Sequence, residues 1–156
     1  MTEADEQRLA ARRAAMDLLA RRDHSRLELS QKLSRHSDDP SLIQEVIDQL
    51  EHDNLFSEQR FTEIFVRSKV EHGFGPFRIR QDLKAKGVAA ELIEQTFSSQ
   101  DIDWLTHARR VYLNRIKHQG EMDSLKLQKQ ARYLHSRGYD GDTVKRAMDM
   151  DDEFYQ

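Results

Sequence analysis

The residues of this chain that could do chemistry are mainly lysines and arginines, and they gather in two stretches. Residues 67–86 hold six bases and two acids, and residues 105–137 hold eight bases and two acids. Such clusters of positive charge bind phosphates of nucleic acids or acidic surfaces of proteins. The candidates for contact with a partner protein or with DNA phosphate are Arg67, Lys69, Arg78, Arg80, Lys84, Lys86, Arg109, Arg110, Lys126, Lys129 and Arg132.

Helical spacing brings some of these cations together. Arg80 and Lys84 are four residues apart and share a face, which we expect to point to solvent. Lys126, Lys129 and Arg132 follow at intervals of three and are expected to form a continuous ridge. The alternative is that the cations are ordinary solvated helix faces.

The acidic residues and the aromatic residues leave two readings open. Residues 41–66 hold six acids and one base, so the basic stretches could pair with this block within the chain. Tyr112 and Tyr133 could stack on nucleic-acid bases, or they could be packing residues. Phe74 could be an exposed anchor for a protein partner, or it could pack beneath its own turn. Trp104 is expected in the core.

No pattern in the sequence indicates catalysis or a metal site. The chain has no cysteine, which excludes disulfides, thiolate metal sites and a thiol nucleophile. His24 and Glu28 are four residues apart, but His24 is expected to precede the helix cap at Ser25, and no third ligand completes a site. No glycine-rich phosphate loop, nucleophile elbow or catalytic triad is recognisable. We therefore expect a non-enzymatic protein without metal or cofactor.

The composition favours thin layers of amphipathic helix. Of the 156 residues, 37% are hydrophobic and 34% are charged, with a formal net charge of −3; typical globular chains are about 45–50% apolar and about 25% charged. No apolar run is long enough to span a membrane. The first residues contain no hydrophobic signal core, so a cytoplasmic location is expected.

Nine helices are expected from start and stop signals. Phe61, Ile64, Phe65 and Ser68 share one face of the fourth helix, and the last residues, DMDDEFYQ, are expected to fray. The eighth helix should direct Leu127, Ala131 and Leu134 inward. The first helix should cover residues 8–22 and the sixth about 89–97, and the other helices should start at or just after Ser25, Asp39, Ser57, Gly75, Asp101 or Asp103, Asp123, and Asp140.

A repeat of about 50 residues relates the helices in groups of three. Three sets of positions recur with spacings of 50 and 51 residues: Leu33, Leu83 and Leu134; Ile43, Ile93 and Val144; and Ile47, Phe97 and Met148. We therefore predict an all-α fold of three tandem three-helix repeats in an elongated, curved array of right- or left-handed twist. The repeats are expected at residues 1–55, 56–100 and 101–156.

The most specific motifs lie in the middle of the chain. RLELSQKL begins at Arg26, and DNLFSEQRFTEIFVRSKVEHGFGPFRIRQDLKAKGV covers residues 53–88. The second stretch joins an acidic-Arg-Phe entry to a basic helix end, a Gly-x-Gly-Pro turn and a terminal Lys-Gly pair. With these features the chain resembles the RecX regulatory proteins of bacteria over about residues 10–150.

The resemblance implies three three-helix repeats and a role as a negative regulator of the RecA recombinase. Proteins of that family bind the RecA–DNA filament, are thought to lie in its groove, and inhibit ATP hydrolysis, strand exchange and co-protease activity. The expected context is regulation of DNA repair, recombination and the SOS response. The expected partners are the RecA filament and, through the basic segments, DNA; no membrane is expected, and the chain is expected to be a monomer.

Two other functions remain open from the residues alone. A stand-alone helical nucleic-acid-binding protein would bind DNA without RecA and with a steep dependence on salt. A general helical-repeat scaffold would bind an unrelated protein.

Overall fold

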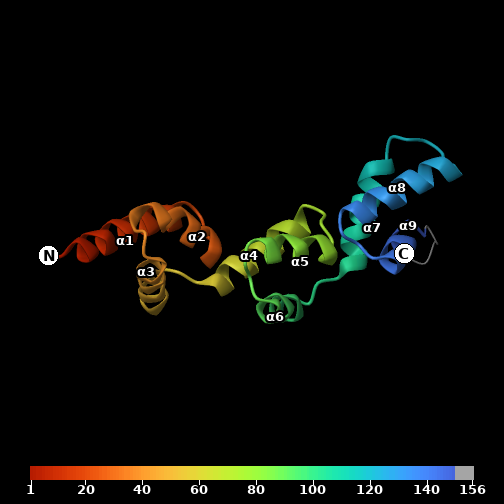
Figure 1. Cartoon of the computed structure of the whole chain (residues 1–156). Coiled ribbons are helices and arrows are strands. Elements are labelled where there is room, and N and C mark those ends of the chain that lie inside the picture. Colours follow the sequence, from red (N-terminus) through yellow and green to blue (C-terminus); the bar gives the residue numbers. More distant parts are fainter. Residues whose placement is uncertain (150–156) are drawn as a thin grey trace. The chain divides into compact units, whose positions relative to one another are not determined.

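The computed structural model describes residues 1–149, and within them all regular structure is helical. The fold class predicted from the sequence is confirmed, because the nine α-helices of the described part follow one another in three groups of three (Figure 1). The predicted fraying of the last residues lies, beyond Asp149, outside the described part. The helices are α1 (Glu3–Arg21), α2 (Arg26–Leu33), α3 (Pro40–His52), α4 (Glu58–Glu71), α5 (Pro76–Ala85), α6 (Ala90–Gln100), α7 (Trp104–Ile116), α8 (Ser124–Ser136) and α9 (Gly141–Met148), with a 3₁₀ turn, Ser34–His36, after α2.

The chain divides into two compact units. Unit 1 comprises residues 1–64 and 83–96, and unit 2 comprises residues 65–82 and 97 onward. The boundaries fall inside α4, α5 and α6, so each of these helices contributes residues to both units.

Unit 1 is built around α1, α2 and α3. Leu29 and Leu33 of α2 and Ile47 and Leu50 of α3 are fully buried and pack with the alanine face of α1. The helix α1 begins earlier than predicted, because Thr2 forms a capping box with Asp5.

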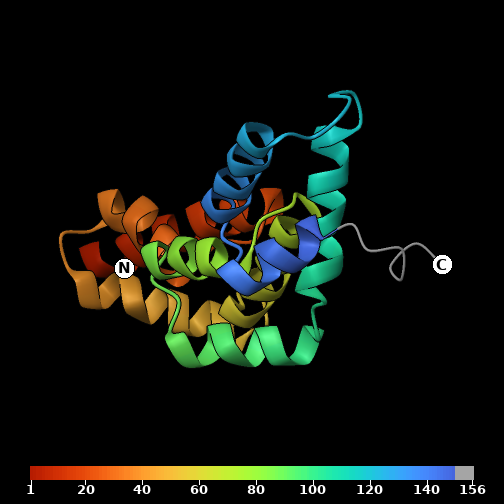
Figure 2. The same cartoon turned by 90° about the vertical axis from the view of Figure 1, so that its right-hand side faces the viewer.

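Unit 2 contains α7, α8 and α9, and α7 packs against α8 and α9 (Figure 2). Tyr112 and Leu134 are buried at the centre of this core. Two expectations need correction. Trp104 packs against this core but is only half-buried, because it lies at the first turn of α7, where the centres of its ring and the Phe97 ring are 5.6 Å apart in an edge-to-face arrangement. Leu127 is 36% exposed, since the inward face of α8 begins further along the helix.

The buried face of α4 also differs from the predicted one. Ile64 and Ser68 are exposed, whereas Thr62, Val66 and Val70 are buried. The hydroxyl of Thr62 donates to a backbone carbonyl one turn earlier at 2.8 Å. This bond satisfies the hydroxyl, so a residue that reads as polar in the sequence occupies the core.

The repeated positions occupy equivalent places in the three helix groups. Leu33, Leu83 and Leu134 are fully buried, and the second set of repeat positions is at most 3% exposed. Gly87 and Gly138 follow α5 and α8 with φ of +80° and +103°. At each of these two ends the backbone N–H groups of the glycine and of the residue after it donate to carbonyls of the last turn, which is a Schellman motif. After α2, which lacks this glycine, the chain instead forms the 3₁₀ turn.

Candidate functional site

Positive charge is concentrated in unit 2. Within the described residues, unit 1 has 11 lysines and arginines against 16 acidic residues, and unit 2 has 14 against 9. The formal net charges are therefore −5 and +5. Nine of the eleven candidate cations belong to unit 2, and Lys84 and Lys86 belong to unit 1.

Four of the candidate cations are exposed and have no hydrogen bond or ion pair within the described part of the chain. They are Arg67 on α4, Lys84 on α5, and Lys129 and Arg132 on α8. A cation that is not engaged within its own chain can meet an anionic partner without first losing a contact. These four side chains are therefore the most direct candidates for electrostatic contact with a partner.

Other candidate cations hold the fold together. Arg80 was predicted to point to solvent, but it is half-buried, with its guanidinium carbon 4.7 Å from the centre of the Phe97 ring. This cation–π contact keeps the long side chain folded onto its own unit. Arg109 donates to the backbone carbonyl of Arg146 at 2.8 Å, and the guanidinium of Arg110 donates to two carbonyls at the end of α4.

The predicted ridge on α8 is also interrupted. The ammonium of Lys126 donates to the backbone carbonyls of Gln119 and Glu121 at 3.0 and 3.2 Å, so this side chain caps the preceding loop. Lys129 and Arg132 alone remain exposed along that line.

The tyrosines do not offer the stacking surface that one reading of the sequence allowed. Tyr112 is 1% exposed and belongs to the core of unit 2. The ring of Tyr133 is covered by the guanidinium of Arg115, whose central carbon is 3.5 Å from the ring centre. The Tyr112 ring is therefore unavailable for a nucleic-acid base, and Arg115 already occupies one face of the half-buried Tyr133 ring.

Phe74 is half-buried, and three cations lie around its ring. The charged groups of Arg137, Lys69 and Arg78 lie 3.8, 5.0 and 5.5 Å from the ring centre. All four residues belong to unit 2. We call this set, Phe74 with Lys69, Arg78 and Arg137, the Phe74 cluster. The ring holds three positive charges close together, whereas an isolated surface lysine contributes only one.

The start of α5 is fixed to the end of α8 within unit 2, and we call this contact the second junction. The N–H of Gly75 donates to the carbonyl of Arg137 at 2.7 Å, and the N–H of Phe77 donates to the carbonyl of Gly138 at 3.0 Å. A Cβ on Gly138 would lie 2.5 Å from the backbone nitrogen of Arg78. The two backbones therefore touch directly, and only glycine permits this approach.

Arg137 closes the second junction through its side chain. Its guanidinium donates to the carbonyls of His72 and Gly73, at the end of α4, while it stacks on Phe74. Arginine suits this place because its planar group can donate in two directions and stack at the same time.

The start of α2 meets the end of α5 within unit 1, and we call this contact the first junction. A Cβ on Gly87 would lie 2.8 Å from the Cβ of Leu27, so a side chain approaches the glycine here. Glu28 accepts hydrogen bonds from the Ser25 N–H at 3.1 Å and from Arg22 at 3.0 Å, and it lies 3.6 Å from the ammonium of Lys86.

The environment of Glu28 favours its charged form. Burial by itself would raise the pKa of this carboxyl, but the hydrogen bonds from Arg22 and Ser25 and the charge of Lys86 outweigh burial and lower the pKa from 4.5 to about 2. The first junction thus contains a partly buried carboxylate that is held by cations.

His24 belongs to the same region of unit 1. The residue is 2% exposed, with Nδ1 3.0 Å from the Arg22 carbonyl and Nε2 3.0 Å from the ammonium of Lys32. In this arrangement Nδ1 donates and Nε2 accepts, which requires a neutral ring. Desolvation by burial lowers the pKa of His24. Within residues 1–149 no group of three potential ligands is arranged to hold a metal ion.

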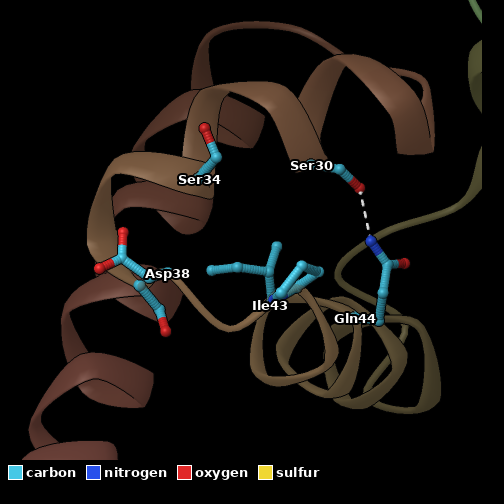
Figure 3. A pocket seen from close by; sticks show the side chains of 7 residues that line it. Ser30, Ser34, Asp38, Ile43 and Gln44 are labelled. Carbon is cyan, nitrogen blue, oxygen red and sulfur yellow. Dashed lines mark hydrogen bonds between the residues drawn. The ribbon is translucent and has the colours of Figure 1, made fainter.

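A cavity of about 310 Å³ opens in unit 1 between α2 and α3 (Figure 3). Its hydroxyl groups are already engaged. Ser30 accepts from Gln44 at 3.0 Å, Ser34 donates to a carbonyl of α2 at 2.7 Å, and Ser37 accepts a backbone N–H at 3.1 Å. Since these groups are satisfied within the chain, we assign no ligand to the cavity.

The sequence does not single out two residues of the second junction. Arg137 stands out only as one member of a basic stretch, and Phe77 is 63% exposed beside Arg78 without any motif that marks it. A signal for Arg137 was present, because Lys86-Gly87 and Arg137-Gly138 occupy the same positions of the repeat. Phe77 had no comparable signal, since an aromatic residue in the first turn of a helix is as often buried as exposed.

Comparisons with known proteins agree with the arrangement of the helices. A family model described as "RecX, first three-helix domain" matches residues 11–50, and one described as "RecX, second three-helix domain" matches residues 57–96. A curated protein of Halorhodospira halophila named Regulatory protein RecX is 42% identical over 156 residues, which cover 98% of this chain and 97% of that protein. A protein of the same name from Pseudomonas fluorescens is 37% identical and covers 90% of both chains.

Solved structures share the fold. The crystal structure of RecX from Lactobacillus salivarius has a TM-score of 0.78 at 21% identity and covers 92% of this chain and 96% of that one. Another structure titled "Crystal structure of regulatory protein RecX" has a TM-score of 0.79 at 18% identity and covers 92% of this chain and 73% of that one. Among the described residues no helix is long and apolar enough to cross a membrane. With relatives of this identity along nearly its whole length, the chain belongs to the RecX family of regulatory proteins.

Proposed function

We propose that this chain is a negative regulator of RecA that binds in the groove of the RecA–DNA filament. In this role it lowers ATP hydrolysis, strand exchange and co-protease activity, and so restrains recombination, DNA repair and the SOS response. The observation that carries the proposal is the 42% identity to a Regulatory protein RecX over 98% of the chain.

The distribution of charge supports a role in binding. Unit 2 has a formal net charge of +5 among its described residues, and a RecA–DNA filament offers both acidic protein surface and phosphate. Arg67, Lys129 and Arg132 in unit 2 and Lys84 in unit 1 are exposed cations that no intramolecular contact engages within the described residues. Charges of this kind steer association and fix orientation.

Inhibition then follows from occupation of the groove. A bound regulator hinders the access of duplex DNA and of co-protease substrates, and it blocks filament growth. Binding changes the behaviour of a filament only through different affinities for its states. The protein must therefore bind a slowly hydrolysing or dissociating state of the filament more tightly than the active state.

The test is ATP hydrolysis by RecA on single-stranded DNA with increasing amounts of the protein. We expect hydrolysis to fall to below about half at saturation. The variant with Arg67→Glu and Arg132→Glu should need roughly tenfold more protein for half inhibition, which corresponds to about 1.4 kcal/mol of binding free energy. Arg80 is left unchanged, because its cation–π contact with Phe97 would confuse binding with stability.

A matched control carries the same change of charge in unit 1. Arg13 and Arg21 are exposed on α1, so Arg13→Glu with Arg21→Glu should inhibit almost as well as the unmodified protein. Unchanged hydrolysis at saturating unmodified protein would contradict the proposed function. Equal loss in the two double variants would contradict the assignment to unit 2.

A second function, binding of nucleic acid without RecA, is favoured by the positive charge of unit 2 alone. It predicts strong binding of single-stranded DNA by the isolated protein and a steep loss of affinity between low and moderate salt. The net charge of −3 for the whole chain opposes it. Fluorescence anisotropy with a labelled oligonucleotide, with and without RecA, separates the two functions.

A further inference from the structure

The two junctions use the same positions of the repeat but differ in charge at one of them. Glu28 is the third residue of α2, and Arg78 is the third residue of α5. The residue before the terminal glycine is a cation in both cases, Lys86 in the first junction and Arg137 in the second. The first junction therefore combines an acid with a cation, whereas the second has cations at both positions.

The first junction shows which group this geometry accommodates. The Glu28 side chain is 16% exposed and contacts both Arg22 and Lys86. Its second oxygen accepts the N–H of Ser25, which begins the helix. A carboxylate at this place thus accepts the backbone N–H at the start of the helix and also contacts two cations.

The second junction has the cations but not the carboxylate. Lys69, Arg78 and Arg137 surround the ring of Phe74. Within residues 1–149 the one ion pair that any of these three cations makes joins Arg78 to Asp82 at 3.4 Å. The face of an aromatic ring carries partial negative charge and offsets part of this repulsion. A full anion would offset more of it, so the cluster is suited to binding one.

An exposed aromatic residue lies next to the cations of the Phe74 cluster. Phe77 follows the second glycine of the turn by two residues and is 63% exposed, and its equivalent, Leu27, lies close to Gly87 and is 40% exposed. An exposed aromatic residue flanked by arginine is the composition of energetically important contacts in protein interfaces.

We propose that the second junction is a receptor for an acidic side chain of a protein partner. The carboxylate of the partner contacts Arg78, Arg137 and Lys69, in the place that Glu28 fills in the first junction, and an apolar residue beside it packs on Phe77. The identity of the partner as a RecA filament rests on the proposed function. A carboxylate is favoured over a phosphate because the equivalent site within this same chain already holds a carboxylate.

The decisive variant is Arg78→Glu, which would install an internal carboxylate at the position equivalent to Glu28. We expect it to melt at a higher temperature than Arg78→Ala, because the new carboxylate gains Arg137 and Lys69 as partners. The difference should shrink in high salt. Both variants should bind RecA filaments at least about tenfold more weakly, since one lacks a cation and the other fills the site.

Arg132→Glu is the control for net charge. It makes the same change on an exposed part of α8 and should show no rise in melting temperature relative to Arg132→Ala. A melting temperature of Arg78→Glu below that of Arg78→Ala would overturn the proposed receptor. Filament binding by Arg78→Glu as tight as that of the unmodified protein would overturn it as well.

A further arm distinguishes the source of the anion. Binding to single-stranded DNA without RecA should be equally affected by Arg78→Glu and Arg132→Glu, because each replaces a positive charge with a negative one. If Arg78→Glu lost DNA affinity as strongly as filament affinity, the anion would be a phosphate and the carboxylate assignment would be wrong. Failure of the unmodified protein to bind RecA would instead contradict the proposed function, while the order of melting temperatures would still decide whether the junction accepts a carboxylate.

Discussion

The first and second junctions solve one packing problem by different means. In the first, a leucine side chain approaches Gly87, and an ion pair between Glu28 and Lys86 accompanies it. In the second, backbone meets backbone at Gly138, and hydrogen bonds replace the ion pair. The two junctions thus join equivalent helix ends of the repeat but are held by different interactions. Backbone hydrogen bonds and the Arg137 side chain hold the second junction, and Arg78 is exposed for contact with a partner.

The same difference extends to the two units. Unit 1 has more acidic than basic residues, and some of its cations form ion pairs within the unit, such as Arg26 with Asp48 and Arg60 with Asp23. Unit 2 has more basic than acidic residues, and several of its cations stack on aromatic rings, donate to backbone carbonyls or are exposed to solvent. We infer that both units use cations for their own stability and that unit 2, through Arg67, Lys129 and Arg132, also presents exposed cations to a partner.

The largest expected effect is the loss of the backbone contact in the second junction. Gly138→Ala forces a Cβ to within 2.6 Å of the backbone nitrogen and Cβ of Arg78, at a φ of +103°. We expect a loss of at least about 3 kcal/mol in the free energy of unfolding, because backbone cannot move aside as a side chain can. Urea denaturation measures it. Gly120→Ala is the control, since a Cβ there would meet no described atom within 4 Å apart from its chain neighbours, and it should lose only about 1 kcal/mol.

Acid should weaken the first junction selectively. The pKa of Glu28 is about 2 in the folded chain, so the unfolded chain takes up this proton first as the pH falls. The stabilisation is therefore complete above about pH 4.5 and is lost between pH 4.5 and 2, with a total of about 2–3 kcal/mol. Urea midpoints from pH 7 to 3 check this. Glu28→Gln should be less stable at neutral pH but should show a flatter profile below pH 4.5.

His24 adds an earlier step to the same profile. Its pKa is lowered in the folded chain, so stability is fully present above about pH 6.5 and decreases as the pH falls below that value. The cause is desolvation together with the ammonium of Lys32, which a protonated ring would repel. His24→Gln should remove this step and leave the Glu28 step in place. A profile of His24→Gln identical to that of the unmodified chain would contradict the assignment.

A smaller effect is expected from alanine at the glycine of the first junction. Gly87→Ala places a Cβ 2.8 Å from the side chain of Leu27, which can shift. The loss should be about 1–2 kcal/mol, mostly from the strain of φ at +80°. If Gly87→Ala cost as much as Gly138→Ala in urea denaturation, the distinction between a side-chain junction and a backbone junction would fail.

The smallest stability effect is expected where function should suffer. Arg132→Glu changes an exposed side chain that has no hydrogen bond or ion pair to any other described residue, so the free energy of unfolding should change by less than about 0.5 kcal/mol. Arg80→Glu removes the contact with Phe97 and should cost about 1 kcal/mol. Melting curves and the RecA hydrolysis assay on the two variants separate a binding cation from a structural one. Equal stability of the two would contradict the structural role of Arg80.

The sequence predicted the repeat well, because Leu33, Leu83 and Leu134 must be buried for each helix to pack and glycine must follow a helix that ends in a left-handed turn. It placed Leu127, Ile64 and Arg80 less well. Helical periodicity fixes which residues share a face, but neighbouring elements decide which face is buried. The junctions could not be predicted for the same reason. Gly75 and Gly138 are 63 residues apart in the chain, and nothing in the sequence indicates that they pair.

The proposed regulation of RecA is tested most directly by titrating the protein into a RecA filament on single-stranded DNA while ATP hydrolysis is followed. Progressive inhibition should occur with the unmodified chain and with Arg13→Glu/Arg21→Glu, and about tenfold weaker inhibition with Arg67→Glu/Arg132→Glu. A rate that stays constant up to saturating concentrations of the folded, unmodified chain would contradict it.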